Sequence, residues 1–274
     1  MNRKNVFKFA AISLAVFMYS CNSGSNHSDE HGTDSTHKDT TAHKEHEAAH
    51  WSYEGETAPN NWATECGFEA CSGKHQSPID IAAATASQEL VDLKLDYKGT
   101  EKCVFINNGH TVQVNITESV NNTFTLNDKT YKLKQFHFHC PSEHTIAGKP
   151  FVSEVHLVHK TDAGDIAVIG VLIEEGTENL FLASILDELP KKAEAEDEID
   201  NSVNPSDLLP ADDNYYAYDG SLTTPPCTEG VKWFVLKTPI KASKAQIEAL
   251  EAAMPDNNAR PVQPVNDRMV KEAI

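Results

Sequence analysis

Three histidines on two strand-like segments have the residue type and the spacing of a metal site. His137 and His139 alternate with Phe136 and Phe138, and His156 follows in a second apolar segment. Because successive side chains of a strand point to opposite faces, His137 and His139 share one face. If the strand that carries His156 lies alongside, three ring nitrogens converge on one cation and leave a fourth position for water. This is the ligand set of a catalytic zinc ion, Zn2+, whose bound water becomes hydroxide near neutral pH.

The same pattern also has an ordinary structural explanation. A single histidine is more often a surface or core residue than a ligand, and alternation of polar and aromatic residues is typical of any half-buried strand. Two neighbours favour the metal site, because Gln135 and Glu154 each precede a candidate ligand by two residues. Histidines that bind a metal usually donate their other N–H group to such an acceptor.

Length and charge limit the class of protein. A chain of 274 residues, of which 39% are hydrophobic, can bury a sizeable core within one domain. Its formal net charge of −18 argues against nucleic acid as a partner, since phosphate binding needs a basic face.

The first 20 residues have the pattern of a secretory signal peptide. Arg3, Lys4 and Lys8 precede or enter an apolar stretch over residues 9–19, which is too short to span a bilayer as a helix. The stretch ends at Ser20 and Cys21, which resembles a bacterial lipoprotein processing site. We therefore expect an exported protein, periplasmic or at the cell surface, that touches a membrane only through a lipid on Cys21. Simple secretion, with Cys21 unmodified, is the alternative.

Residues 21–50 are almost free of apolar side chains and are predicted to be a disordered tether. Such a histidine-rich arm either collects zinc loosely or is only a solvated spacer. The irregular spacing of its histidines implies no fixed coordination geometry. They are His27, His31, His37, His43, His46 and His50.

Short strand-like segments dominate the rest of the chain, residues 51–274, and predict an α+β domain built on a sheet. Two helices are predicted over residues 178–189 and 244–253, the second with Ser243 as its N-cap. The predicted strands cover residues 104–106, 111–116, 123–126, 131–139, 153–159, 166–173 and 232–236.

Six motifs in this domain, in their order along the chain, resemble the α-class carbonic anhydrases. The resemblance implies a single domain around a central, largely antiparallel, twisted ten-stranded sheet with short peripheral helices. It also implies zinc-dependent, reversible hydration of carbon dioxide to bicarbonate. The motifs lie at residues 73–79, 107–110, 135–139, 142–145, 154–159 and 221–226.

The resemblance assigns roles to individual residues. His137, His139 and His156 match the zinc ligands, and Gln135 and Glu154 match the acceptors that orient them. Thr223 matches the hydroxyl that accepts a hydrogen bond from zinc-bound hydroxide and donates its own proton to Glu143. Because a carboxylate only accepts, this order aims a lone pair of the hydroxide at carbon dioxide.

Further positions match the walls of the family's cleft. His110 matches a proton shuttle, although on the residues alone it is a turn histidine after Asn107, Asn108 and Gly109. The matching polar positions are Tyr53, Asn108, Gln113 and Thr224. The positions that match the apolar wall for carbon dioxide are Val158, Val168, Leu222 and Trp233, which the residues alone would place in the core.

The resemblance also bears on the disulfide pairing of the cysteines and on the ligands of the protein. Export makes at least one disulfide expected, and Cys71 and Cys227 match a pair that is bridged in bacterial members. For Cys66, Cys103 and Cys140, a second bridge and an intermolecular one both stay open. The resemblance further implies binding of sulfonamides and small anions, and a possible homodimer.

Two other functions compete with the enzyme. Related domains that lack zinc ligands act as binding modules, but this chain keeps all three histidines together with Glu143 and Thr223. A zinc-scavenging lipoprotein, with the histidine-rich tether as its active part, is the second competitor.

Overall fold

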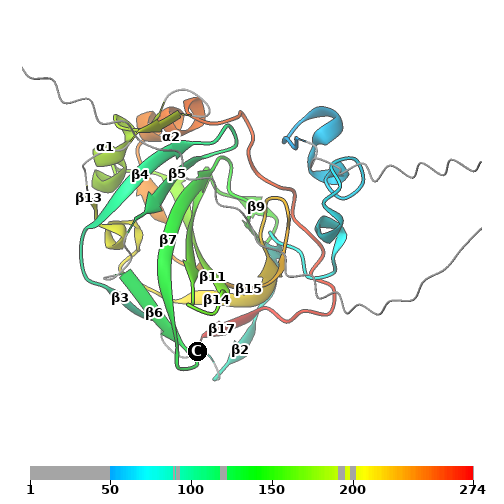
Figure 1. The fold of residues 1–274 in the computed structure, drawn as a ribbon. Helices are drawn as coiled ribbons and strands as arrows, with labels where there is room; N and C mark the ends of the chain where they lie inside the picture. Colours follow the sequence, from blue (N-terminus) through cyan, green and yellow to red (C-terminus); the bar gives the residue numbers. More distant parts are fainter. Residues whose placement is uncertain are drawn as a thin grey trace, which may run out of the picture. The chain divides into compact units, whose positions relative to one another are not determined.

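The computed structural model describes residues 50–88, 90, 93–117, 122–190, 195–197 and 202–273 (Figure 1). The predicted signal peptide, Cys21 and the tether up to residue 49 lie outside the described residues. Within the described part, no helix has the length and hydrophobicity to cross a membrane.

A large twisted sheet organises the domain, and its main path contains ten strands within the described part of the chain. Most neighbours on this path are antiparallel, and the exceptions are β11 with β15 and β17 with β2. In order across the sheet, the strands are β12 (Ala195–Asp197), β4 (Glu101–Asn107), β5 (Val112–Ile116), β7 (Lys129–His139), β10 (Ser153–Lys160), β11 (Ile166–Glu175), β15 (Glu229–Leu236), β14 (Tyr215–Ser221), β17 (Lys271–Ala273) and β2 (Thr85–Ser87).

Shorter elements extend this sheet and surround it. Four strands join the main path from the side: β3 (Lys94–Tyr97), β6 (Asn122–Leu126), β13 (Ser202–Val203) and β16 (Ile240–Ala242). A separate sheet contains β1 (Asp80–Ile81), β8 (Thr145–Ile146) and β9 (Lys149–Pro150). The helices are α1 (Leu180–Leu186) and α2 (Lys244–Ala252), with 3-10 turns η1 (Gly55–Thr57), η2 (Pro59–Asn61), η3 (Glu69–Ser72) and η4 (Pro205–Leu208).

The predicted fold class is confirmed, and so are the seven predicted strands and both helices. The ten-stranded sheet that the resemblance implies corresponds to the main path, to which the structure adds the four lateral strands. Ser243 caps α2 in a reciprocal capping box with Gln246, as its position before the apolar repeat indicates. Helix α1 begins later than predicted because Asn179 caps it, accepting a hydrogen bond from the Leu182 amide, and it ends at Leu186, before the predicted residue 189. Strand β14 was not predicted, and its Asp-Gly-Ser end is typical of a turn.

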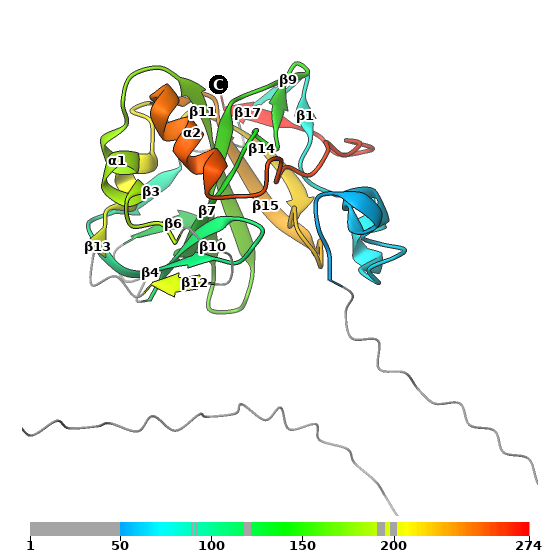
Figure 2. The same ribbon diagram turned by 90° about the horizontal axis from the view of Figure 1, so that it is seen from above.

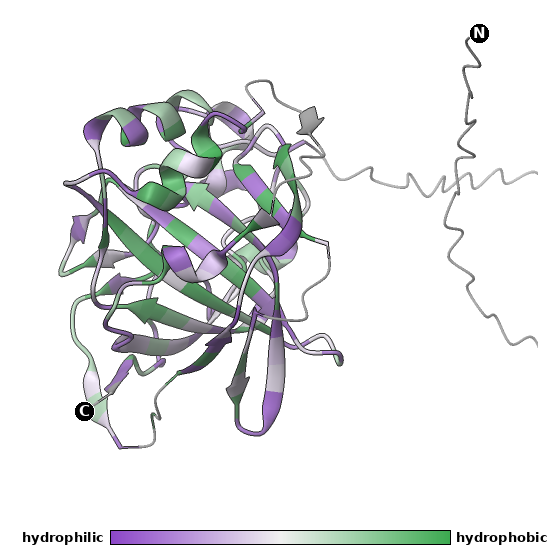
Figure 3. Ribbon diagram, turned by 90° about the vertical axis from the view of Figure 1, so that its left-hand side faces the viewer, coloured by the Kyte–Doolittle hydropathy of each residue, from purple (hydrophilic) through white to green (hydrophobic). Residues whose placement is uncertain are grey.

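The two faces of the central strands have different partners. Phe136 and Phe138 of β7 and Leu157 of β10 lie in the larger hydrophobic core, which also contains Phe181 of α1 and Ile247 of α2. Figure 2 shows both helices on the same side of the domain, and Figure 3 shows the hydrophobic stretches along the strands. The opposite face of β7 and β10 is therefore the one that carries the histidines.

A β-bulge interrupts the pairing of β7 with β10. Val158 pairs with Gln135, whereas the next residue, His159, pairs with Leu133, so Lys134 has no partner in this ladder. Such an extra residue bends the strand and re-aims side chains. It explains why Leu133 and Phe136, three residues apart, are both fully buried.

The predicted disulfide is confirmed: Cys71 and Cys227 are bridged, with their Cα atoms 4.9 Å apart. The bridge ties the segment after Thr223 to the N-terminal part of the domain, across a separation of 156 residues. Cys66 and Cys140 are buried and form no disulfide with another described residue, and Cys103 is also buried.

Candidate metal centre and cleft

The register of two neighbouring strands brings three histidines together. His137 of β7 lies directly opposite His156 of β10, and His139 follows on the same face of β7. Each of these three side chains offers a nitrogen, and these atoms all lie within 4.8 Å of one another. His139 and His156 are buried, whereas His137 retains some exposure. We call this group the histidine centre.

Acceptors outside the histidine centre hold one nitrogen of each ring. His137 Nδ1 lies 2.8 Å from Gln135 Oε1, and His139 Nδ1 lies 2.8 Å from the backbone carbonyl of Asn258. Because a carbonyl oxygen can only accept, these nitrogens carry the protons. The Nε2 lone pairs of both rings are thereby left for another partner.

Glu154 contacts the outer nitrogen of the third histidine. His156 Nε2 makes an ion-pair contact with Glu154 Oε1 at 2.9 Å, without the geometry of a hydrogen bond. Nδ1 of His156 is on the side of Glu143 Oε2, 3.8 Å away, and faces the histidine centre. The other carboxylate oxygen accepts hydrogen bonds from the amides of Glu143 and His144, at 3.0 and 2.9 Å. Burial alone would raise the pKa of Glu154, but the positive charges of His144 and His156 outweigh it and lower this pKa well below its usual value.

The unsatisfied atoms of the centre fit a metal ion. His139 Nε2 and Glu143 Oε2 are buried and have no hydrogen-bond partner among the described residues. Burial also lowers the pKa of His137 and of His139, which keeps these rings in the neutral form that binds metals. Burial also opposes ionisation of His156, but the charges of Glu154 and Glu143 outweigh it and raise the pKa of this third ring. A bound metal ion would replace the proton on that ring. A set of three imidazoles suits zinc.

A second group that could be mistaken for a metal site is a hydrogen-bond network. His144, Glu154 and His156 also bring donor atoms together. However, His144 Nδ1 lies 2.7 Å from Glu154 Oε1, and His144 Nε2 lies 2.7 Å from the hydroxyl of Tyr218. With its nitrogens engaged in this way, His144 supports the centre instead of offering a ligand atom.

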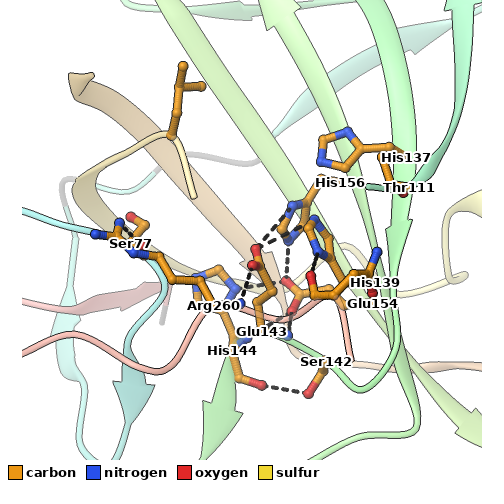
Figure 4. A network of polar contacts seen from close by, with 12 residues as sticks. Ser77, Thr111, His137, His139, Ser142, Glu143, His144, Glu154, His156 and Arg260 are labelled. Atoms are coloured by element: carbon orange, nitrogen blue, oxygen red, sulfur yellow. Dashed lines mark hydrogen bonds and ion pairs between the residues drawn. The ribbon is translucent and has the colours of Figure 1, made fainter. Parts of the chain in front are cut away.

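Glu143 points into the histidine centre. Its Oε2 lies 3.5 Å from His139 Nε2 and 3.8 Å from His156 Nδ1. Figure 4 shows the Glu143 side chain directed at these rings. Its Oε1 accepts a hydrogen bond from the Arg260 amide at 2.8 Å. Thr223 is buried nearby, on the wall of a cavity that His137 and His156 share. The predicted donation from Thr223 to Glu143 is not among the contacts of the structure, and it stays a prediction.

A cavity of about 220 Å³ extends from the histidine centre. We call it the apolar cavity. Most residues of its lining were named in the sequence analysis as ligands, acceptors or wall positions. The exceptions are Lys134, Lys160 and Ile166, which had no predicted role. The complete lining consists of Lys134, Gln135, His137, His156, Val158, Lys160, Ile166, Val168, Leu222, Thr223, Thr224 and Trp233.

His110 lies in a different cavity, of about 450 Å³, which also contains His50, Tyr53 and Asn108. We call it the rim cavity. The His110 ring stacks on Trp51, with centroids 3.6 Å apart and planes 11° apart, and the His50 ring is 5.8 Å away. Partial burial and the charge of His50 lower the pKa of His110.

The comparisons with known proteins agree with this geometry. The family model for eukaryotic-type carbonic anhydrase matches residues 57–274. The chain belongs to this family. A carbonic anhydrase from Klebsiella pneumoniae is 43% identical over 227 residues, which cover 82% of this chain and 92% of that relative.

Solved structures support the same assignment. The Photobacterium profundum α-carbonic anhydrase is 46% identical, with a TM-score of 0.76, and covers 81% of this chain and 100% of its own. An α-carbonic anhydrase from Thermovibrio ammonificans, solved with the inhibitor sulfanilamide, is 39% identical, with a TM-score of 0.77 over 81% of this chain and 99% of its own.

In this carbonic anhydrase three of the four predicted polar positions line the two cavities, and Gln113 is in the lining of neither. Tyr53 and Asn108 line the rim cavity, whereas Thr224 lines the apolar cavity. The Tyr53 hydroxyl has no described hydrogen-bond partner, and burial followed by the charge of Glu143 raises the pKa of Tyr53 well above its usual value. Gln113 pairs with His137 across β5 and β7, and its amide donates to Asn115 at 2.6 Å.

The sequence analysis missed several residues that support the carbonic anhydrase site. Asn258 is fully buried and acts through its backbone carbonyl on His139 and through its side chain on the Cys140 amide. A backbone contact of this kind leaves no signal in residue type. Trp51 also had no predicted role, because its stacking on His110 joins residues far apart in the chain.

Proposed function

We propose that this carbonic anhydrase hydrates carbon dioxide with a zinc ion held by His137, His139 and His156, and with His110 as the proton shuttle. The observation that carries the proposal is the set of three converging nitrogens, each on a ring whose other nitrogen is already engaged. When bound, zinc supplies the Lewis acidity that makes hydroxide available near neutral pH; carbonic anhydrase is itself the standard example of this effect.

Glu143 and Thr223 would orient the nucleophile. Glu143 keeps one oxygen directed at the histidine centre, while the Arg260 amide holds the other. A Thr223 hydroxyl that donates to this free oxygen must then accept a hydrogen bond on its own oxygen, and it would hold the attacking group in one orientation.

The apolar cavity would receive carbon dioxide. Val158, Val168, Leu222 and Trp233 line it beside His156. Carbon dioxide is uncharged, so it loses little on leaving water for such a wall. Bicarbonate is an anion, and its charge favours departure into solvent.

His110 would carry the released proton to buffer. Its lowered pKa keeps the ring neutral at pH 7 to 8, so that it can accept a proton from the cleft. The rim cavity contains His110 together with the polar side chains of Tyr53 and Asn108, which can order the water needed for the transfer.

Stopped-flow hydration of carbon dioxide by the purified chain tests this proposal. We expect activity that is lost on zinc removal, is restored by added zinc and is blocked by a sulfonamide. Zinc-loaded protein without activity would contradict it. A chain lacking residues 22–50 should keep its activity, because the histidine centre lies within the domain; a loss would favour the zinc-scavenging alternative.

The sequence and its resemblance to the family support four further proposals. We propose export with residues 1–20 as signal peptide, anchoring through a lipid on Cys21, and inhibition by sulfonamides and small anions. Mass spectrometry of the membrane fraction tests the lipid, and a Cys21→Ser variant should release the protein. A homodimer is proposed from the resemblance alone, and sedimentation measures it.

A further inference from the structure

Two lysines line the apolar cavity together with the histidines. Lys134 and Lys160 are both exposed, so they mark the end of this cavity that opens to solvent. The lining described above contains no carboxylate, and these lysines are its only permanently charged side chains. This is notable in a chain whose formal net charge is −18.

The backbone explains the position of Lys160. His156, Val158 and Lys160 follow at intervals of two residues along β10, so they share one face of the strand. All three line the apolar cavity. At a strand rise of about 3.3 Å per residue, the Cα atom of Lys160 lies about 13 Å from that of His156, and its side chain can bring the ammonium group closer.

The bulge explains the position of Lys134. Without the bulge, Lys134 and Gln135 would point to opposite faces of β7. Because Lys134 is the unpaired residue of this ladder, it lines the same cavity as Gln135 and His137.

Neither lysine forms an ion pair with a residue that the structure describes. A carboxylate nearby is that of Asp162, which binds Lys132 at 2.8 Å. Lys132 first, and the more distant charge of Lys134 after it, lower the pKa of Asp162. A cleft with charges of one sign and apolar walls focuses the electric field. At low ionic strength this field acts on ions beyond about 10 Å.

We propose that Lys134 and Lys160 form an anion subsite at the open end of the apolar cavity, which draws bicarbonate toward the histidine centre. This inference rests on the proposed function. The overall equilibrium fixes the ratio of kcat/KM in the two directions of the reaction, so the lysines cannot change that ratio. Their effect must appear in the affinity for the anion, while uncharged carbon dioxide enters unaided.

The test compares two double variants of the full, zinc-loaded chain. In K134Q/K160Q, calorimetric titration should show affinities for bicarbonate and thiocyanate that are about 3- to 10-fold weaker at low salt. The loss should fade at about 0.5 M salt, where the Debye length is about 4 Å. The single variants should give intermediate losses. The control, K102Q/K149Q, removes the same charge at exposed positions outside the cavity.

The control should bind both anions within about twofold of the wild type, because screening weakens distant charges. Equal weakening in both double variants, or no weakening in K134Q/K160Q, would overturn the anion subsite. A zinc-loaded wild type without carbon dioxide hydration would instead overturn the proposed function, and the thiocyanate titration would still decide on the lysines. Phenol, a neutral probe, should bind K134Q/K160Q and wild type alike.

Discussion

The histidine centre and the rim cavity both use histidine side chains, but for two tasks with different requirements, metal coordination and proton transfer. His139 and His156 are buried on paired strands, and their outer nitrogens are engaged by Asn258 and Glu154. His110 is partly buried on the turn between β4 and β5, and its ring is contacted from outside that turn by the rings of Trp51, His50 and Tyr53. Coordination needs fixed positions, whereas proton transfer needs access to solvent and freedom to reorient.

Removing a ring from the histidine centre should have the largest effect. We expect His137→Ala, His139→Ala and His156→Ala each to lose bound zinc and to lower kcat/KM on the order of 1000-fold or more, because two rings cannot hold the ion. Metal analysis and stopped-flow hydration measure this. The control His75→Ala, whose side chain is 44% exposed and lies outside the histidine centre, should keep both zinc and activity. Full zinc content with full activity in a ligand variant would refute the assignment.

Thr223 should come next. Thr223→Ala keeps the ligands, so zinc should be retained while kcat/KM falls by about 100-fold, since one oriented hydrogen bond to the reacting group is lost. Thr223→Ser restores the hydroxyl and should recover most of the activity. If the alanine variant matched the wild type, Thr223 would be only a wall residue.

The rim should respond differently from the centre. His110→Ala should lower kcat by about 10- to 100-fold in weak buffer and leave zinc content unchanged, because the proton path and not the metal is affected. Added imidazole should restore the rate. A rate that is low and insensitive to imidazole would place His110 among the structural residues.

The smallest expected effect concerns the pair His50 and His110. Burial comes first and the charge of His50 second in lowering the pKa of His110. His50→Gln removes the repulsion, so the pKa of His110 should rise slightly, while the larger effect of burial stays. In the plot of kcat against pH, the part that rises with pH should shift to higher pH by the same amount. NMR titration of the His110 ring measures the shift, and a downward shift would contradict the contact.

The comparison also shows where sequence analysis succeeds. The alternation of His137 and His139 with phenylalanines fixes their common face, because a strand repeats every two residues. The strand positions, the α2 cap and, through the resemblance, the pairing of Cys71 with Cys227 agree with the structure. These signals are local, or they are carried by residue type.

Only the tertiary structure decided the remaining features, because they depend on contacts between distant backbone segments. The Asn258 carbonyl holds His139 from 119 residues away, and the Arg260 amide holds Glu143 from 117 residues away. The bulge that aims Lys134 into the apolar cavity depends on how β7 pairs with β10. The sequence by itself determined the ligand types and their common face; the folded chain determined which atoms hold them and which charges surround them.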